Sequence, residues 1–191
     1  MRLQDLEFLN THTVAAGQSF YRVQRARRTS TTVVRGPLKM APPGLFDGRF
    51  DLAGVASGYL AEAPETALYE SIFRREATAV SMARIAKYEL IAVQLVRAIQ
   101  VGDLRAHASS WPVLQSLRLQ ETQQISAEAR AAGFDGLMYR SAQQFGQDCL
   151  VLFDPPVGAI KGLWRSPLIK QGALNRWVVD AARGSRVPLA P

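Results

Sequence analysis

Three side chains that can take part in chemistry lie within one short stretch of the chain, residues 48–76. Arg49 follows a glycine, Tyr59 lies at the start of the apolar run GYLAE, and Glu70 follows a proline by less than two helical turns. A guanidinium can form paired hydrogen bonds to phosphate oxygens, and a tyrosine ring can stack on another flat ring. These residue types raise the question of whether residues 48–76 form a site or only a surface.

The segment that carries Glu70 is predicted to be helical from Pro64 onward, because proline is favoured in the first turn of a helix. Leu68 and Ile72 are spaced i, i+4 and should face the core, which places Glu70 on roughly the opposite side. Helical spacing alone therefore favours an exposed ion pair between Glu70 and Arg74, worth about 0.3–0.5 kcal/mol. A functional Glu70 needs support from elsewhere in the chain.

Another arginine, Arg22, lies inside a predicted strand, residues 19–24, whose aromatic and β-branched content is typical of strands. Alternation places Arg22 on the same face of the strand as Phe20 and Gln24. A charged side chain inside a strand is unusual, since charged residues are mostly exposed. The alternative is an arginine at a sheet edge, facing solvent.

The composition is that of a globular protein, with 48% hydrophobic residues among 191, enough for one domain with extensions at both ends. The net charge of +7 and the pI of about 10.1 favour a polyanionic or phosphate-bearing partner, although the positive residues are scattered. Cys149 is the single cysteine, which excludes an internal disulfide and favours a reducing, cytoplasmic setting. Its strand-like surroundings favour a buried core residue over a nucleophile.

Several common kinds of active site are missing from the sequence. His12 and His107 stand alone, so no zinc set is formed and we expect no metal. The phosphate-binding P-loop, the Rossmann glycine motif and the G-x-S-x-G elbow are all absent. We expect no direct nucleic-acid binding, since no RNA-recognition aromatic motif occurs. No apolar run is long enough to span a membrane, and early acidic residues argue against a signal peptide.

The predicted elements describe an α+β domain. Strands are expected near residues 19–24, 31–34, 88–96, 136–140 and 148–153, and helices are expected from about residue 63 and over 122–132. Because strands and helices do not alternate strictly along the chain, a doubly wound parallel sheet is disfavoured. We expect an N-terminal arm over residues 1–18, with a short helix at 3–9, and a main domain over 19–154. A C-terminal extension over 155–191 should be mainly helical, with a helix at about 168–182, and should pack on the same domain.

The order of several short motifs resembles one known family. They are FYR at 20–22, GRFD at 48–51, GYLAE at 58–62, PETALYE at 64–70, GFDGLMYRSA at 133–142 and DCLVLF at 148–153. Together they resemble the RES domain, which is named for its Arg, Glu and Ser residues. The similarity runs from about Phe20 to Phe153, and its specificity lies in the combination and order of the motifs.

The resemblance implies a fold like that of ADP-ribosyltransferases, with mixed sheets around a central cleft, and NAD+ as substrate. RES proteins are typically the toxins of bacterial toxin–antitoxin pairs, and their partner is an Xre-type helix-turn-helix antitoxin. Family members are described as degrading NAD+ with water or phosphate as acceptor, and some as ADP-ribosylating a protein. The resemblance implies no cofactor or metal beyond NAD+ itself, and a cytoplasmic oligomer with the antitoxin.

Five residues match the family pattern, namely Arg22, Arg49, Tyr59, Glu70 and Ser141. The resemblance implies catalytic roles for Glu70, Arg22 and Tyr59, and NAD+-binding roles for Arg22, Arg49, Tyr59 and Ser141. Ser141 would either orient the nicotinamide amide or support Glu70. Each residue also has a structural alternative: a turn cap for Arg49, a core position for Tyr59 and a local turn bond for Ser141. Two functional alternatives stay open, transfer of ADP-ribose to a protein and a non-catalytic basic binding module.

Overall fold

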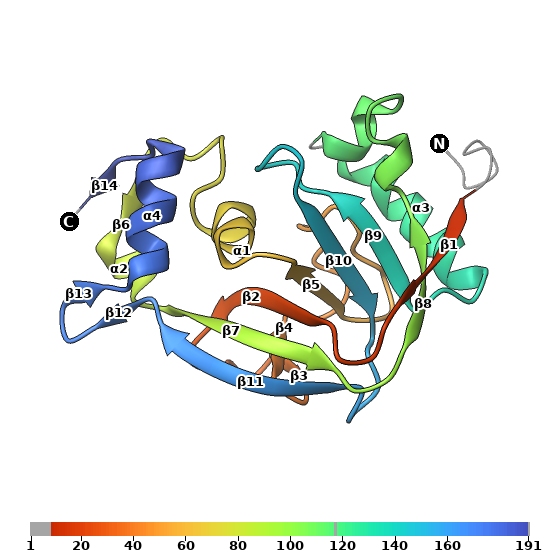
Figure 1. Ribbon diagram of the computed structural model, residues 1–191, viewed down its shortest axis with the longest axis horizontal. Coiled ribbons are helices and arrows are strands. Elements are labelled where there is room, and N and C mark those ends of the chain that lie inside the picture. The colour runs from red at the N-terminus through yellow and green to blue at the C-terminus, as the bar shows by residue number, and fades with distance from the viewer. Residues whose placement is uncertain (1–8, 117, 191) are drawn as a thin grey trace.

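A single eight-stranded sheet organises the molecule in the computed structural model, which describes residues 9–116 and 118–190 (Figure 1). Its strands, in spatial order, are β1 (Asn10–Val14), β8 (Ile99–Asp103), β9 (Gly136–Arg140), β10 (Asp148–Phe153), β5 (Ser57–Ala61), β2 (Ser19–Arg25), β7 (Tyr88–Leu95) and β11 (Ile160–Pro167). Neighbours are antiparallel except β8 and β9, which are parallel. With its helices, this mixed sheet confirms the predicted α+β class.

The sheet nearly divides in the middle. β2 pairs with β7 along its whole length, but it meets β5 at one residue pair only, Tyr21 with Ala61. On one side of this junction lie β1, β8, β9, β10 and β5, and on the other lie β2, β7 and β11, as Figure 1 shows. Because the two halves diverge from a single contact, side chains from both can face a shared space.

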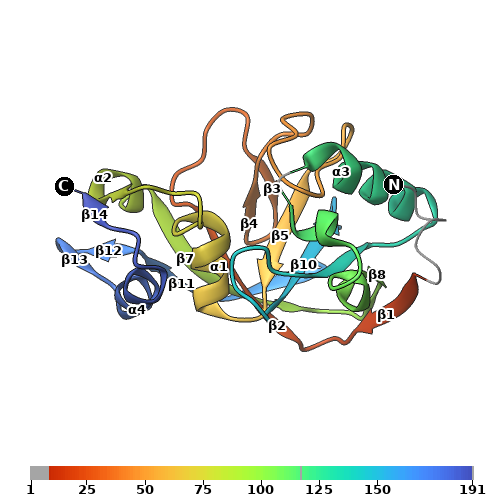
Figure 2. The same cartoon turned by 90° about the horizontal axis from the view of Figure 1, so that it is seen from above.

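The helices are α1 (Pro64–Ser71), α2 (Met82–Ile85), α3 (Leu119–Ala131) and α4 (Arg176–Ser185), with 3-10 turns η2 (Arg105–His107) and η3 (Pro112–Gln115). α1 and α4 lie side by side in one half of the molecule, with α1 nearer the middle, and α3 lies in the other half (Figure 2). Leu68 of α1, Ile125 of α3 and Val178 of α4 share one buried core with Val23 of β2. The helices therefore cover the same face of the sheet.

The opposite face is covered by a hairpin of β3 (Val33–Arg35) and β4 (Leu38–Met40). Its Leu38 and Met40 are buried in a second core with Phe20 and Leu60. The remaining short strands pair as β6 (Val80–Ser81) with β14 (Leu189–Ala190) and β12 (Ile169–Lys170) with β13 (Ala173–Leu174). Alternate residues of β2 and β5 thus enter two different cores, as the pleat of a strand requires.

Local sequence accounts for the position of α1. Pro64 occupies the first turn of the helix, as predicted, and Glu65 adds negative charge where the helix dipole favours it. Leu68 and Ile72 are fully or almost fully buried, so the predicted core face is confirmed. α1 ends at Ser71, which leaves Glu70 in its last turn.

Both ends of the chain contribute to the sheet, which differs from the expected arm and mainly helical extension. Residues 10–14 form the edge strand β1 against β8, whereas the expected helix at 3–9 lies, apart from residue 9, outside the described residues. The C-terminal extension begins with the strand β11, paired with β7. Its helix starts later than expected, at Arg176, because a turn at Gln171 and Gly172, both with positive φ, closes the β12–β13 hairpin first.

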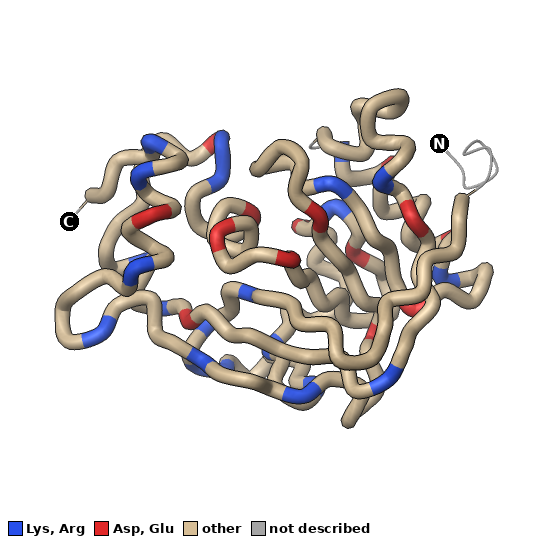
Figure 3. Tube along the Cα trace, in the orientation of Figure 1, with Lys and Arg blue, Asp and Glu red and all other residues tan. Residues whose placement is uncertain are grey.

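Lys and Arg residues are spread over both halves of the molecule (Figure 3). The described residues include no helix with the length and apolar character needed to cross a membrane. Among the same residues, no cluster of three His, Cys, Asp or Glu side chains is placed to hold a metal ion.

Candidate active site

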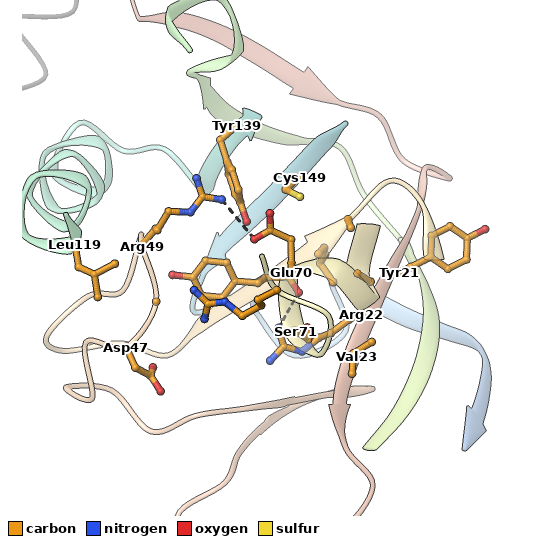
Figure 4. Close-up of a pocket in the computed structure, with 16 residues that line it drawn as sticks. Tyr21, Arg22, Val23, Asp47, Arg49, Glu70, Ser71, Leu119, Tyr139 and Cys149 are labelled. Carbon is orange, nitrogen blue, oxygen red and sulfur yellow. Dashed lines mark hydrogen bonds and ion pairs between the residues drawn. The ribbon is translucent and has the colours of Figure 1, made fainter. Parts of the chain in front are cut away.

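A cleft opens where β2 and β5 separate, beside α1. The space between its walls, including the part open to solvent, is about 820 Å³. A wider hollow of about 1570 Å³ adjoins it on the side of the β3–β4 hairpin and shares several of its lining residues. Four of the five predicted residues line the cleft, namely Arg22, Arg49, Tyr59 and Glu70. Figure 4 shows the cleft and labels three of them, Arg22, Arg49 and Glu70.

The carboxylate of Glu70 is held on one side by the loop that follows β9. Its Oε1 accepts hydrogen bonds from Ser141 Oγ at 2.5 Å, from the Ala142 backbone N–H at 3.0 Å and from the Gln143 backbone N–H at 3.3 Å. Its Oε2 lies 3.5 Å from Arg49 Nη2. The Glu70 side chain is 23% exposed, so it is anchored at its back and accessible from the cleft.

Ser141 lies behind Glu70 and does not line the cleft. Its residue is 2% exposed, and its Oγ also accepts hydrogen bonds from the backbone N–H groups of Gln143 at 3.1 Å and Gln144 at 2.9 Å. The hydroxyl therefore closes a local turn and orients the carboxylate at the same time. Of the two roles considered for Ser141, these contacts support the positioning of Glu70.

Arg49 is almost fully buried, with 8% exposure, and its guanidinium is already engaged. Nη1 donates to the Leu114 carbonyl at 2.7 Å, and Nη2 faces Glu70. The group lies over the ring of Tyr139, 4.8 Å from its centroid, and near the ring of Phe50. Arg49 thus braces Glu70 from the side opposite Ser141.

Arg22 reaches into the gap between the two halves of the sheet. Nη1 donates to the Tyr59 carbonyl at 2.7 Å and Nη2 to the Lys39 carbonyl at 3.3 Å, as Figure 4 shows for the first of these bonds. β2 is an interior strand, so the alternative of an edge arginine facing solvent is wrong. Burial lowers the pKa of Arg22 to about 10, which leaves the guanidinium charged at neutral pH.

The tyrosine hydroxyl of Tyr59 joins β5 to the GRFD turn. It donates to Asp51 Oδ1 at 2.9 Å and accepts from the Phe50 backbone N–H at 2.8 Å, while Asp51 Oδ2 accepts from the Gly48 N–H at 2.8 Å. Burial raises the pKa of Tyr59 well above its usual value, so the hydroxyl stays protonated. A Cβ on Gly48 would lie 2.5 Å from the Tyr59 hydroxyl, which explains the glycine of this motif.

Three of the other lining residues, Arg74, Tyr139 and Cys149, carry functional groups but were not predicted as site residues. Arg74 lines the cleft, but it pairs with Glu76 at 2.6 Å instead of forming the expected exposed pair with Glu70. Tyr139 and Cys149 are paired across the β9–β10 hairpin and project toward the cleft. The predicted hairpin register, combined with alternation, could have placed both side chains on one face.

Comparison with known proteins identifies the family and the fold. The family model described as RES domain matches residues 19–168, which extends the match through β11. No curated protein sequence matches the chain. Among solved structures, a chain of the M. tuberculosis MbcT–MbcA toxin–antitoxin complex is similar, with a TM-score of 0.60 and 15% identity over 81% of this chain and 85% of that chain. The structural likeness concerns the fold, and the family match shows that this protein belongs to the RES domain family.

Proposed function

We propose that this protein is the toxin of a bacterial toxin–antitoxin pair and that it degrades NAD+ by cleaving the bond between nicotinamide and ribose. Membership of the RES domain family supports the proposal, as does the similarity of its fold to a chain of a toxin–antitoxin complex. The partner would be an antitoxin of the Xre helix-turn-helix type. Co-expression followed by purification on a tag on this chain would test that partnership.

The observation that carries the proposed chemistry is the anchored carboxylate of Glu70 at the wall of the cleft. Cleavage of the glycosidic bond sends its electron pair to the nicotinamide nitrogen and leaves positive charge on the ribose. Water or phosphate then adds to the ribose carbon, and a proton is released. A carboxylate held beforehand by Ser141 and Arg49 can stabilise that cation without reorganising during the reaction.

The other walls of the cleft suit the remainder of NAD+. Arg22 places a partly buried cation at the wall of the cleft, where pyrophosphate oxygens could accept its hydrogen bonds. Tyr59, which is only partly buried, adds flat surface that suits a nicotinamide ring. Nicotinamide leaves as a neutral molecule, so the mechanism needs no strong general acid.

The direct test is to incubate the purified protein with NAD+, with and without phosphate, and to measure free nicotinamide. We expect Glu70→Gln to lower kcat by about 10²–10³-fold, the size of effect seen when one preorganised electrostatic group is removed. Glutamine can still accept the bonds from Ser141 and Ala142, so the variant should fold. Glu65→Gln, which changes a carboxylate in the first turn of the same helix, is the matched control and should retain its rate.

Absence of nicotinamide release from the folded protein would contradict the proposal. Retention of turnover within a few-fold by Glu70→Gln would remove Glu70 from the mechanism. NAD+ labelled in its ADP-ribose part separates hydrolysis and phosphorolysis, which leave the label on small molecules, from transfer, which attaches it to protein.

A further inference from the structure

Two nitrogen atoms in the cleft are buried without a hydrogen-bond partner. They are Nε of Arg22 and Nε of Arg74, and they are the only such side-chain atoms among residues 9–116 and 118–190. Buried polar groups are normally paired, so an unpaired donor calls for an explanation. Both arginines line the cleft and also the adjoining hollow. The two arginines that carry these covered donors therefore border the same connected space.

The other cation in the cleft, Arg49, is poorly placed to receive a ligand. Its guanidinium is engaged with the Leu114 carbonyl and with Glu70, and it is covered by the ring of Tyr139. Moving it onto a ligand would break these contacts and release the carboxylate that it braces. Arg49 is thus a positioning residue for Glu70.

Arg22 lacks a counter-charge. Its hydrogen-bond partners are neutral carbonyl groups, and no carboxylate of the described residues lies within ion-pair distance of it. A partly buried cation without a counter-ion is costly, and burial of the guanidinium lowers the pKa of Arg22. An anionic group entering the cleft would supply the missing charge.

Arg74 is held from outside the cleft. Its side chain is 38% exposed, and its Nη2 pairs with Glu76, whose side chain is 42% exposed. Nε of Arg74 has no hydrogen-bond partner. Glu76 in turn accepts a hydrogen bond from Gln143 at 3.2 Å, in the loop that anchors Glu70. The ion pair with Glu76 therefore holds Arg74 through Nη2, and the Nε donor stays unpaired.

We propose that Arg22 and Arg74 form the phosphate-binding pair of the cleft and that Arg74, rather than Arg49, is the second arginine that binds the ligand. The inference rests on the proposed function for its choice of ligand, the pyrophosphate of NAD+. Phosphate oxygens of an inorganic phosphate acceptor have the same chemistry, so the experiment must separate the two sources. A phosphate bound between two guanidinium groups accepts charge-assisted hydrogen bonds from both.

The experiment measures binding without catalysis. Inorganic pyrophosphate and ADP-ribose are titrated calorimetrically into the full chain, and into its Arg74→Gln and Arg74→Lys variants, at about 0.15 M salt so that distant charges are screened. We expect Arg74→Gln to weaken the binding of both compounds about tenfold or more, since a hydrogen bond between charged groups is lost. Arg74→Lys should recover part of the affinity, because it keeps the charge but not the planar donors.

Arg165→Gln is the charge-matched control, because Arg165 is exposed on β11 and does not line the cleft. It should bind both compounds within about twofold of the unchanged protein, since exposed charges contribute little. Inorganic phosphate titrated into protein saturated with ADP-ribose separates the sources. Exclusion of phosphate by ADP-ribose assigns the arginine pair to the pyrophosphate. Simultaneous binding of phosphate that is lost in Arg74→Gln assigns the pair to the acceptor.

Equal binding by Arg74→Gln and the unchanged protein would overturn the proposal. So would an equal loss in Arg165→Gln, or no binding of either compound by the unchanged protein. Loss of binding in Arg74→Gln, in a protein that releases no nicotinamide, would uphold the phosphate-binding pair and refute the proposed reaction. If both hold, Arg74→Gln should raise KM for NAD+ and leave kcat within a few-fold, unlike Glu70→Gln.

Discussion

Replacing Ser141 with alanine removes one hydroxyl that makes three hydrogen bonds in a buried place. The bond to Glu70 at 2.5 Å involves a charged acceptor, for which about 1.5–3 kcal/mol is typical. The backbone N–H of Gln144 would lose its acceptor, at a cost of about 1–3 kcal/mol if it stays dry. The N–H of Gln143 keeps its contact with Glu70. Because the losses overlap, we expect the free energy of unfolding to fall by about 2–4 kcal/mol.

The same change should lower kcat more than it alters KM. Ser141 does not line the cleft, so its loss reaches the substrate only through a less well-held Glu70. If about 1.5–3 kcal/mol of that positioning is expressed in the transition state, kcat falls by about 10- to 100-fold. Urea unfolding gives the stability, and the initial rate of nicotinamide release gives kcat and KM. Ser166→Ala, on the exposed strand β11, should change neither quantity.

A rise in KM at constant kcat would refute this reasoning, because it would mean that the Ser141 hydroxyl contacts the substrate. A folded Ser141→Ala variant with unchanged kcat would refute it as well, since Glu70 would then hold its catalytic position without the serine.

Three further expectations follow from contacts around the cleft and the sheet. Gly48→Ala should lower the free energy of unfolding by about 1–3 kcal/mol, because the new Cβ would lie 2.5 Å from the hydrogen-bonded hydroxyl of Tyr59. Thermal unfolding should show a lower midpoint, and an unchanged midpoint would contradict this packing. Burial raises the pKa of the Cys149 thiol, which is 1% exposed, so iodoacetamide should label it, by mass spectrometry, only in urea; rapid labelling of the native protein would disprove burial. Although burial opposes the shift, hydrogen bonds from Arg105 hold the pKa of Asp103 below its usual 3.8, so the unfolded chain binds more protons than the folded one. The resulting stabilisation is full above about pH 4 and is lost as the pH falls through the folded-state pKa. In urea titrations between about pH 5 and pH 3, Asp103→Asn should therefore lose less stability than the unchanged protein, and parallel losses would contradict the ion pair.

Elements with a strong local pattern could be predicted from the sequence. The strands at Gly136–Arg140 and Asp148–Phe153 and the start of α1 at Pro64 lie where they were expected. Apolar alternation and a proline in the first turn act over a few residues, so no distant contact is needed to specify them. The strand at Ile160–Pro167 was missed because its residues are mostly exposed, and it is stabilised as an edge strand by pairing with β7.

The sequence by itself determined which residue types the cleft could contain, since the family pattern already grouped Arg22, Arg49, Tyr59, Glu70 and Ser141. The tertiary structure decided what each of them does. Helical spacing allowed Glu70 to pair with Arg74, only four residues away, yet the carboxylate is bound by Ser141, 71 residues away along the chain. That preference arises because folding brings the start of the loop after β9 against the end of α1, where its N–H and hydroxyl donors find Glu70 as an acceptor. No local pattern encodes such a meeting, and it leaves Arg74 to pair with Glu76 at the wall of the cleft.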